Sequence, residues 1–425
     1  MKVTKLDLPF GQSRLSAHVR SPSLVGVFTP REFKETPDEQ ALIRSALQKP
    51  TGTPRLRELA RRGQKVVIVT SDLTRPCPSP RLIPSIVDEL EAGGIASRDI
   101  TIVIALGLHR ARIAAQLETF AGLSLCGRMQ VVNHDPMDTV PVGVTTAGTP
   151  VELLQRVAAA DLRVCLGNIE FHYFAGYSGG AKAILPGCAS EATIKANHAM
   201  MVRPGAVAGQ LDGNPVRADL EEGAAMLGVD FILNVVLNSD HHIVGAFAGD
   251  ATAAHRQGCQ MVAQRGLTAI PKRSDIVLVS AGGRPQDVNL YQAQKALDNA
   301  SQGVRDGGIL IWVAECREGF GNATFESWLR GSPSPADLLD RFHQGFVLGA
   351  HKAAAIARVL SKARVYLVSA LAADVVRSCG MLPFDDLEPA LREAFAELGP
   401  NASVSVLPYG SSILLREEAN MRTAL

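Results

Sequence analysis

Short runs of apolar, often β-branched residues recur along the chain, and each run ends in a polar or glycine-rich turn that is followed by a helical pattern. Their apolar positions are nearly continuous and do not alternate, which is typical of parallel strands buried on both faces. Strands that alternate with helices in this way predict an α/β fold with parallel sheets. The clearest runs are residues 65–76, 99–110, 161–172, 274–283, 307–316 and 363–371.

Polar and glycine residues close four of these runs, at the point where each predicted strand ends. Ligands of open parallel sheets bind outside the carboxyl ends of the strands, so we expect these residues to contribute to one composite site. In chain order they are Asp72, Thr74, Arg75, His109, His172, Gly282 and Gly283.

A domain boundary is predicted between residues 268 and 269, because the stretch RGLTAIPKRSD at 265–275 interrupts the pattern before a new strand begins. A chain of 425 residues is long enough for two sizeable cores. We therefore expect an N-terminal catalytic domain at 1–268 and a C-terminal α/β domain at 269–425. The active site is expected in the cleft between them.

Composition narrows the class of protein further. The net charge is +1 and Lys and Arg are scattered, so the sequence lacks the basic face that binds nucleic acid and the polybasic patch that binds a membrane surface. No signal peptide and no apolar run of about 18 residues is present. Seven cysteines without a C-x-x-C pair disfavour a disulfide framework or a structural zinc site. These features indicate a cytoplasmic protein that binds a small molecule.

A glycine-rich stretch at residues 171–200 contains two histidines and, just after its glycines, the lysine Lys182. Gly176, Gly179 and Gly180 surround Ser178, and glycines there permit positive φ angles and an anion-binding nest of N–H groups. Because Ala181 precedes the lysine, the stretch is not a nucleoside-triphosphate P-loop.

The chemical residues of this stretch each have two interpretations. Lys182 is either a solvated loop lysine or a desolvated amine, whose lowered pKa would make it nucleophilic. His198 lies in a predicted helix and is either a packed or surface histidine or a ligand. The spacing of His172 and His198 matches no diagnostic metal motif.

The second half of the chain contains a helix with a polar face. The helix is expected to begin near Asp287 or Asn289, either of which can cap it. Tyr291, Gln292 and Lys295 then lie on adjacent stripes. A phenol, an amide and an ammonium group suit a small oxygen-rich acid, although an ordinary amphipathic helix with a solvated face has the same pattern.

Taken together, five motifs resemble the nickel-pincer lactate racemase family. They are SDLTRP, GLHR, HYFAGYSGGAKAILPG, NH and GGRPQDVNLYQAQKAL, in the order and at roughly the separations that the family shows. The resemblance implies two α/β domains and a racemase or epimerase of 2-hydroxy carboxylic acids. It also implies a nickel-pincer nucleotide, the pyridinium-3-thioamide-5-thiocarboxylic acid mononucleotide, which holds nickel through sulfur, carbon and sulfur.

The resemblance assigns a role to each matching position. Lys182 corresponds to the lysine that is linked covalently to the cofactor, and His198 to the nickel ligand. His109 and His172 correspond to the two catalytic bases, and Arg75 corresponds to the arginine that orients the substrate. Arg75 and Lys295 are also counted among the catalytic residues. Tyr291, Gln292 and Lys295 correspond to substrate contacts. The remaining cofactor-binding positions are Asp72, Thr74, Ser178, Gly179 and Gly180, of which Asp72 and Thr74 either contact the cofactor or orient a histidine.

The family mechanism implied here is proton-coupled hydride transfer through a 2-keto acid. Two alternatives differ in class. A nicotinamide-dependent dehydrogenase would need a G-x-G-x-x-G turn after an early strand, which the chain lacks. A non-catalytic carrier of the cofactor would need Lys182 and His198 but not His109, His172 and Arg75 together.

The sequence also departs from the family pattern near the substrate. Leu108 precedes His109 where a threonine is usual, and neither Trp312 nor Trp328 matches the indole that contacts lactate in the founding member. Arg75 and Lys295 supply cations for one carboxylate and one oxygen, so we expect a monocarboxylic acid larger than lactate. Expected partners are the substrate and the cofactor-biosynthesis enzymes, with no nucleic acid and no membrane. The sequence does not determine the oligomeric state, and a homo-oligomer is one of the alternatives.

Overall fold

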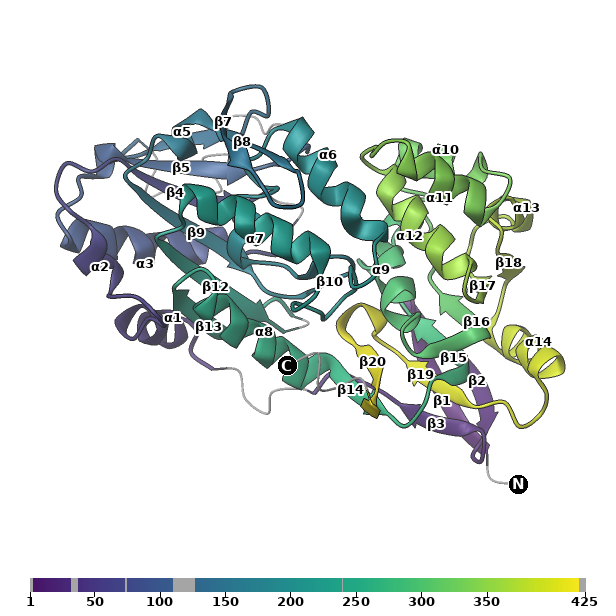
Figure 1. Ribbon diagram of the computed structural model, residues 1–425. Helices are drawn as coiled ribbons and strands as arrows, with labels where there is room; N and C mark the ends of the chain where they lie inside the picture. The colour runs from purple at the N-terminus through teal and green to yellow at the C-terminus, as the bar shows by residue number, and fades with distance from the viewer. Residues whose placement is uncertain (1–2, 32–36, 73–74, 110–126, 239, 420–425) are drawn as a thin grey trace. The chain divides into compact units, whose positions relative to one another are not determined.

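The structure, a computed structural model, describes residues 3–31, 37–72, 75–109, 127–238 and 240–419 (Figure 1). The chain forms two compact units, which we call the first unit, residues 32–264, and the second unit, residues 1–31 with 265–425. The chain passes from the first unit back to the second unit after residue 264, four residues before the predicted boundary at 268. The first 31 residues pack with the C-terminal residues, however, which a continuous domain at 1–268 does not provide for.

The first unit contains a six-stranded sheet in the order β13-β12-β9-β4-β5-β6. All neighbours are parallel except β12 and β13, which are antiparallel. The predicted runs at 65–76, 99–110 and 161–172 contain β4, β5 and β9, which lie side by side, as expected for buried parallel strands. The strands are β4 (Val66–Ser71), β5 (Ile100–Ala105), β6 (Gln130–Asn133), β9 (Leu162–Asn168), β12 (Phe231–Leu237) and β13 (Ile243–Gly249).

Helices and small hairpins surround this sheet (Figure 1). A hydrophobic core forms where the apolar stripes of α1 and α3 meet the buried side chains of the strands. The helices are α1 (Glu39–Gln48), α2 (Leu56–Leu59), α3 (Ser79–Ala92), α5 (Gln155–Ala158), α6 (Glu191–Ala199), α7 (Pro215–Leu227) and α8 (Ala253–Gly266). The hairpins are β7 (Thr139–Val144) with β8 (Pro150–Leu154), and β10 (Phe171–His172) with β11 (Gly176–Tyr177).

The second unit contains another six-stranded sheet, in the order β18-β17-β16-β15-β19-β3, and every pair of neighbours is parallel. The three predicted runs of this half are confirmed as β15, β16 and β17. The strands are β3 (Leu24–Val27), β15 (Ser274–Ser280), β16 (Val304–Val313), β17 (Arg364–Val368), β18 (Leu382–Phe384) and β19 (Val404–Leu407). The second unit also has the parallel pair β14 (Leu267–Ile270) and β20 (Leu414–Glu417).

The N-terminal residues belong to the second unit because they complete its sheet and its core. Strand β3 pairs with β19 at the sheet edge. The antiparallel pair β1 (Val3–Phe10) and β2 (Ser13–Arg20) buries Leu6, Leu8, Ala17 and Val19 in the same core as β15 and β16. One face of this hairpin therefore packs on side chains that lie more than 250 residues away in the chain.

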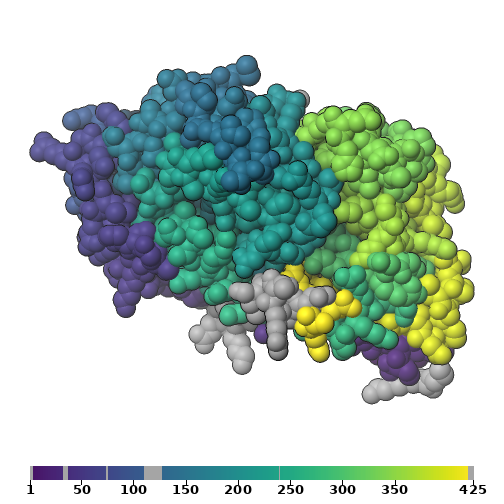
Figure 2. Space-filling view, viewed as in Figure 1, coloured from purple at the N-terminus to yellow at the C-terminus, as the bar shows by residue number. Residues whose placement is uncertain are grey.

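The described residues of the second unit include six helices. Helices α10, α11 and α12 contact one another and form a continuous light-green area of the surface in Figure 2. The helices are α9 (Leu290–Ala300), α10 (Ala323–Arg330), α11 (Pro335–His343), α12 (Ala350–Leu360), α13 (Ala373–Ser378) and α14 (Leu387–Leu398). Among the helices of the described ranges, none combines the length and the hydropathy that crossing a membrane requires.

Candidate functional site

Asp72 and His109 meet at the carboxyl ends of the neighbouring strands β4 and β5. The Asp72 side chain is 2 % exposed, and its Oδ2 lies 3.0 Å from Nδ1 of His109, whose side chain is 34 % exposed. A carboxylate accepts hydrogen bonds, so His109 donates through Nδ1 and its Nε2 is the atom that can accept a proton. Of the two roles that the sequence allowed for Asp72, the structure shows the contact with a histidine.

His172 lies in β10, immediately after the carboxyl end of β9, which neighbours β4 in the sheet. The backbone N–H of Ala175 donates to its Nδ1 over 3.3 Å. The ring stacks on Tyr173, with centroids 5.1 Å apart, and meets the ring of Phe174 at 4.6 Å. Because Nδ1 of His172 accepts the hydrogen bond from Ala175, the single hydrogen of its neutral ring is on Nε2. His172 and His109 therefore have opposite tautomers.

The three glycines around Ser178 all have positive φ angles, as the sequence predicted: +75° at Gly176, +76° at Gly179 and +60° at Gly180. Two N–H groups of this loop point into the protein, since Ser178 N–H donates to Glu170 O and Gly180 N–H to Asn234 Oδ1. These two groups are therefore not available to bind an anion in a nest. The Ser178 hydroxyl is also engaged, donating to Asn168 O at 2.8 Å.

Replacing Gly176 by Ala is expected to destabilise the protein by at least about 3 kcal/mol, because two costs add. The left-handed backbone costs roughly 1–2 kcal/mol for any other residue, and a Cβ would lie 2.0 Å from the Gln210 carbonyl oxygen. Gly228→Ala is the matched control, since Gly228 has φ +84° but no atom within 4 Å of a Cβ. Urea unfolding measures both free energies, and equal losses would show that the close backbone approach is unimportant.

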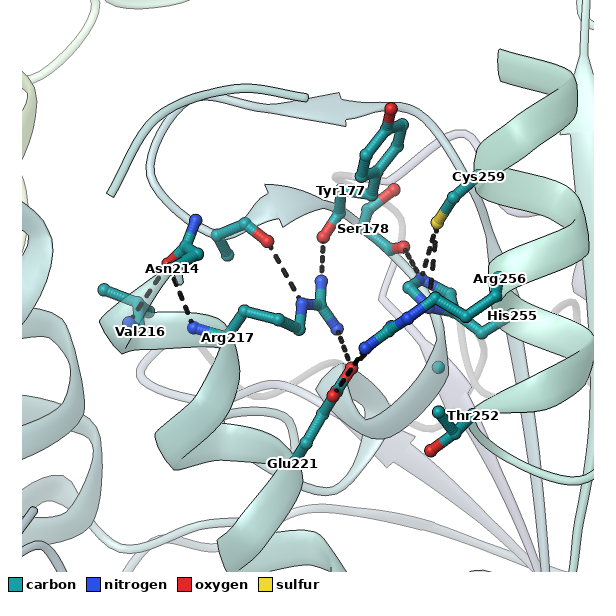
Figure 3. A network of polar contacts seen from close by, with 12 residues as sticks. Tyr177, Ser178, Asn214, Val216, Arg217, Glu221, Thr252, His255, Arg256 and Cys259 are labelled. Carbon is teal, nitrogen blue, oxygen red and sulfur yellow. Dashed lines mark hydrogen bonds and ion pairs between the residues drawn. The ribbon is translucent and has the colours of Figure 1, made fainter. Parts of the chain in front are cut away.

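Two buried basic residues far along the chain hold this loop by its carbonyl groups (Figure 3). Arg217 on α7 is 1 % exposed and donates to the carbonyl oxygens of Ala175 and Tyr177. His255 on α8 is fully buried, and its Nε2 lies 2.8 Å from Ser178 O, which fixes it as the donor. The sequence analysis missed both residues because nothing near them in the chain marks them as partners of the loop.

The Arg217 guanidinium is itself compensated by an acid on its own helix. Glu221 lies 3.4 Å from Arg217 and 2.8 Å from Arg256 of α8, so one carboxylate serves two cations (Figure 3). Removing Glu221 would leave the buried Arg217 charge without its acidic partner, which is destabilising. The glycine loop is therefore anchored to both α7 and α8.

Lys182 follows this loop in a short 3-10 turn, Gly180–Ala183, and its ammonium nitrogen lies 5.7 Å from the centre of the Phe174 ring. Burial lowers the pKa of Lys182 well below its ordinary value, and the positive charges of Arg217 and Arg75 lower it further. Both effects favour the neutral amine. The pKa of this half-buried lysine is thus shifted in the direction that the desolvated interpretation requires.

His198 lies in the last turn of α6, which begins at the N-cap Ser190. Its Nδ1 is 3.1 Å from Oδ1 of Asn197, and its ring meets the Phe174 ring edge-on with centroids 5.0 Å apart. Phe174, which is 2 % exposed, therefore contacts His172, Lys182 and His198. Across the part of the chain that is described, no three His, Cys, Asp or Glu side chains group closely enough to hold a metal ion.

Arg75 is exposed, three residues beyond Asp72, and its N–H donates to the Asp72 carbonyl oxygen at 3.1 Å. The positive charge of Arg75 contributes to the lowered pKa of Lys182. Thr74 lies outside the described residues. The first unit thus contains Asp72, Arg75, His109, His172, Ser178, Gly179, Gly180, Lys182 and His198.

Tyr291, Gln292 and Lys295 all lie on α9 of the second unit, as the sequence predicted. Asn289 caps the helix, accepting the N–H of Gln292 at 3.0 Å. Asp287, the other candidate cap, is instead buried and accepts the N–H of Gly11 at 2.7 Å. It therefore joins the turn between β1 and β2 to the beginning of this helix.

A buried lysine that the sequence analysis did not single out supports Tyr291. Lys352 of α12 is 6 % exposed, and its Nζ donates to the Tyr291 carbonyl oxygen at 2.5 Å and lies 4.0 Å from the centre of the Tyr291 ring. The neighbouring His351 meets the Tyr291 ring edge-on, with ring centroids 6.4 Å apart, and stacks on Phe346. These contacts hold the Tyr291 ring against α12.

Both tryptophans of the chain are packed in the second unit. Trp312 of β16 is fully buried. Trp328 of α10 is 6 % exposed, carries the Arg341 guanidinium 3.9 Å from its ring centre, and meets the ring of Phe342. Both indoles are therefore packed against their own unit.

Comparison with known proteins covers nearly the whole chain. Residues 10–209 match the family described as lactate racemase N-terminal domain, and residues 270–415 match the lactate racemase C-terminal domain. The lactate racemase of Thermoanaerobacterium thermosaccharolyticum is 34 % identical over 98 % of this chain and 100 % of its own length. The lactate racemase of Lactiplantibacillus plantarum is 33 % identical, over 97 % and 99 %.

Solved structures give the same picture. The lactate racemase apoprotein from Thermoanaerobacterium thermosaccharolyticum superposes with a TM-score of 0.89 at 34 % identity, covering 97 % of this chain and 100 % of that one. A protein from Thermotoga maritima has a TM-score of 0.64 at 18 % identity, covering 92 % and 100 %. The second likeness shows the fold alone.

Proposed function

Since the chain belongs to the lactate racemase family of isomerases, we propose that it interconverts the enantiomers of a lactate-type 2-hydroxy acid by hydride transfer through a planar 2-keto acid. The observation that carries this proposal is the grouping in the first unit. The Asp72–His109 pair stands at the ends of adjacent strands, and His172, Lys182 and His198 surround Phe174.

The reaction sets requirements that these residues meet. The Cα hydrogen of a 2-hydroxy carboxylate is very weakly acidic, so removing it as a proton would require stabilising a dianionic enolate. Removing the hydroxyl proton while Cα loses hydride avoids that difficulty. The 2-keto acid is flat, and hydride can return to either face. A base is needed for each enantiomer, and imidazole is a suitable group near neutral pH.

We assign the two base roles to His109 and His172. His109 accepts the hydroxyl proton at Nε2, and the Asp72 carboxylate holds its Nδ1–H and stabilises the imidazolium that forms. His172 has its Nδ1 on the Ala175 N–H, so it begins with hydrogen on Nε2. To accept a proton at Nε2, His172 must exchange tautomer, which loosens its contact with Ala175.

The first unit also fits the cofactor that the family resemblance implies. A cofactor that supplies three of the four donor atoms needs one protein ligand, and an imidazole such as His198 suits nickel alongside sulfur. Lys182 offers an amine that its surroundings favour in the neutral, nucleophilic form. When bound, the nickel-pincer nucleotide would supply the hydride acceptor.

Substrate contacts are proposed for Arg75, Tyr291, Gln292 and Lys295. The planar guanidinium of Arg75 is exposed and suits a carboxylate in two-point contact. Lys295 is the second proposed cation, for the hydroxyl or keto oxygen, and the phenol of Tyr291 and the amide of Gln292 add hydrogen-bonding groups.

A substrate panel tests the proposed function. Protein co-expressed with the cofactor-building enzymes and supplied with nickel should racemise lactate, and we expect 2-hydroxybutyrate, 2-hydroxyisovalerate or phenyllactate to show a higher kcat/KM. An additional methylene in an apolar pocket contributes roughly 10- to 200-fold. Malate and gluconate are included as controls of different size and charge. Lactate or malate at the top of the ranking would contradict the size prediction, whereas failure with all the acids would contradict the function itself.

Racemisation in heavy water tests the proposed mechanism. Hydride removed from Cα stays with the enzyme until it returns, so the product should retain its original Cα hydrogen almost completely. Proton NMR of the recovered acid measures this retention, and traces of the 2-keto acid should accumulate. Incorporation of deuterium at Cα in step with racemisation would instead establish direct deprotonation.

A further inference from the structure

We propose that Asn197 and Asp219 are positioning residues that fix the tautomer of His198, so that its Nε2 is the atom presented to nickel. The inference rests on the proposed function only in taking His198 as the metal ligand. Its structural part concerns buried side chains of the first unit: α6 supplies Asn197 and His198, α7 supplies Asp219, and the turn between β7 and β8 supplies two threonines.

The orientation of the Asn197 amide follows from its neighbours. Asn197 is fully buried, and one end of its amide lies 2.7 Å from Oδ2 of Asp219 and 3.2 Å from the Val216 carbonyl oxygen. A backbone carbonyl can only accept, and a carboxylate accepts as well. The end that faces both must therefore be the nitrogen, and the opposite end is the amide oxygen.

Asp219 is held equally firmly. Its side chain is 2 % exposed, with Thr145 Oγ1 2.5 Å from Oδ1 and Thr149 Oγ1 3.0 Å from Oδ2. The two hydroxyls and the Asn197 amide give this carboxylate three donors. Both threonines are less than 5 % exposed. Water therefore has little access to the chain of hydrogen bonds, and its members keep one arrangement.

The tautomer of His198 is the consequence. Its Nδ1 lies 3.1 Å from the Asn197 amide oxygen, which can only accept, so Nδ1 must donate. A neutral imidazole has one N–H, and the lone pair is then on Nε2, the nitrogen that can bind a metal. In the other tautomer two lone pairs would face each other. The edge-on contact with Phe174 holds the plane of the same ring.

A purely structural role for Asn197, joining α6 to α7, would leave the tautomer of His198 unaffected. Nitrogen NMR of the protein labelled with ¹⁵N-histidine and prepared without cofactor separates the two roles, because the couplings of each ring show which nitrogen bears hydrogen. His198→Gln identifies the signal. We expect Nδ1–H at His198 in the unaltered protein, and a signal for Nε2–H would overturn the proposal.

Variants make the test specific. Asn197→Leu keeps the volume but removes the acceptor, and the Nδ1–H preference should be lost. The double variant Asn197→Asp with Asp219→Asn again places an acceptor oxygen against Nδ1, so the preference should return, although the Val216 carbonyl oxygen loses its donor and the variant should be less stable. Ser190→Ala is the control, because it removes the N-cap of the same helix without touching Asp219, Asn197 or His198. A change of tautomer in Ser190→Ala equal to that in Asn197→Leu would contradict the proposal.

Nickel retention provides the second readout. In protein loaded with cofactor, Asn197→Leu should weaken retention against a chelator by about 10- to 100-fold, and the exchanged double variant should recover most of it. Unchanged retention in Asn197→Leu would overturn the proposal. If His198→Gln itself retained nickel fully, the ligand assignment in the proposed function would fail. The tautomer measured without cofactor would still test whether Asn197 and Asp219 orient His198.

Discussion

Replacing His109 by Ala is expected to lower racemisation by at least about 10² to 10⁴ in both directions, and His172→Ala should do the same. Each variant loses the base for one enantiomer, and because racemisation passes through both proton transfers, neither direction survives. Initial rates from each pure enantiomer, followed by polarimetry or chiral chromatography, measure the loss. His242→Ala is the control, since His242 is exposed and contacts Glu39.

The dependence of His109 on Asp72 can be tested in the same assay. Asp72→Asn keeps the shape but allows the amide to present either atom to Nδ1, so the wrong tautomer becomes accessible and the rate should fall by roughly 10² to 10⁴. Added imidazole should restore part of the rate in His109→Ala and none in Asp72→Asn. A wild-type rate in His109→Ala would remove this histidine from the mechanism.

Replacing Lys182 by Ala is expected to abolish any covalent adduct with the cofactor and to reduce racemisation to near background. The amine is held in the turn after the glycine loop, and burial together with Arg217 and Arg75 lowers its pKa, so the nucleophilic form is favoured. Intact mass measures the adduct and the rate measures the activity. Lys195→Ala is the matched control, because Lys195 is exposed and pairs with Glu191 on its own helix. Full activity in unmodified Lys182→Ala protein would refute the assignment.

The same lowered pKa predicts a pH-dependent effect on stability. Between the lowered pKa in the folded state and the ordinary value near 10.5, the unfolded chain binds the proton and the folded chain does not. The contribution of Lys182 to the free energy of unfolding of the cofactor-free protein therefore rises with pH through that window. Lys182→Met should be the more stable protein at pH 7, and the advantage should shrink as the pH approaches 10.5. Urea unfolding at several pH values measures it, and an advantage that grew with pH would contradict this reasoning.

Much of the architecture could be predicted because the signals are local. The apolar runs at 65–76, 99–110 and 161–172 became three adjacent parallel strands, and Asp72, His109 and His172 follow them as expected. The positive φ angles of the glycine loop were also predictable, because only glycine adopts them without strain. These are properties of a residue and its near neighbours.

Contacts between distant parts of the chain escaped the sequence. The hairpin at residues 3–20 carries no marker of its partner in the sequence, yet it packs in the core of the second unit. Arg217, His255 and Lys352 are ordinary basic residues in helices, and their roles come from carbonyl groups dozens of residues away. A local pattern indicates which residues will be buried but does not identify the residues that they will contact.

The sequence by itself determined the α/β class, the strands that position the polar residues, and a set of site residues recognisable by type and order. Only the tertiary structure decided which state each of those groups adopts. Asp72 sets the proton of His109, Asn197 sets that of His198, and burial beside two cations sets the charge of Lys182. The physical reason is that hydrogen bonding and desolvation depend on the atoms within a few ångströms, and folding alone brings those atoms together.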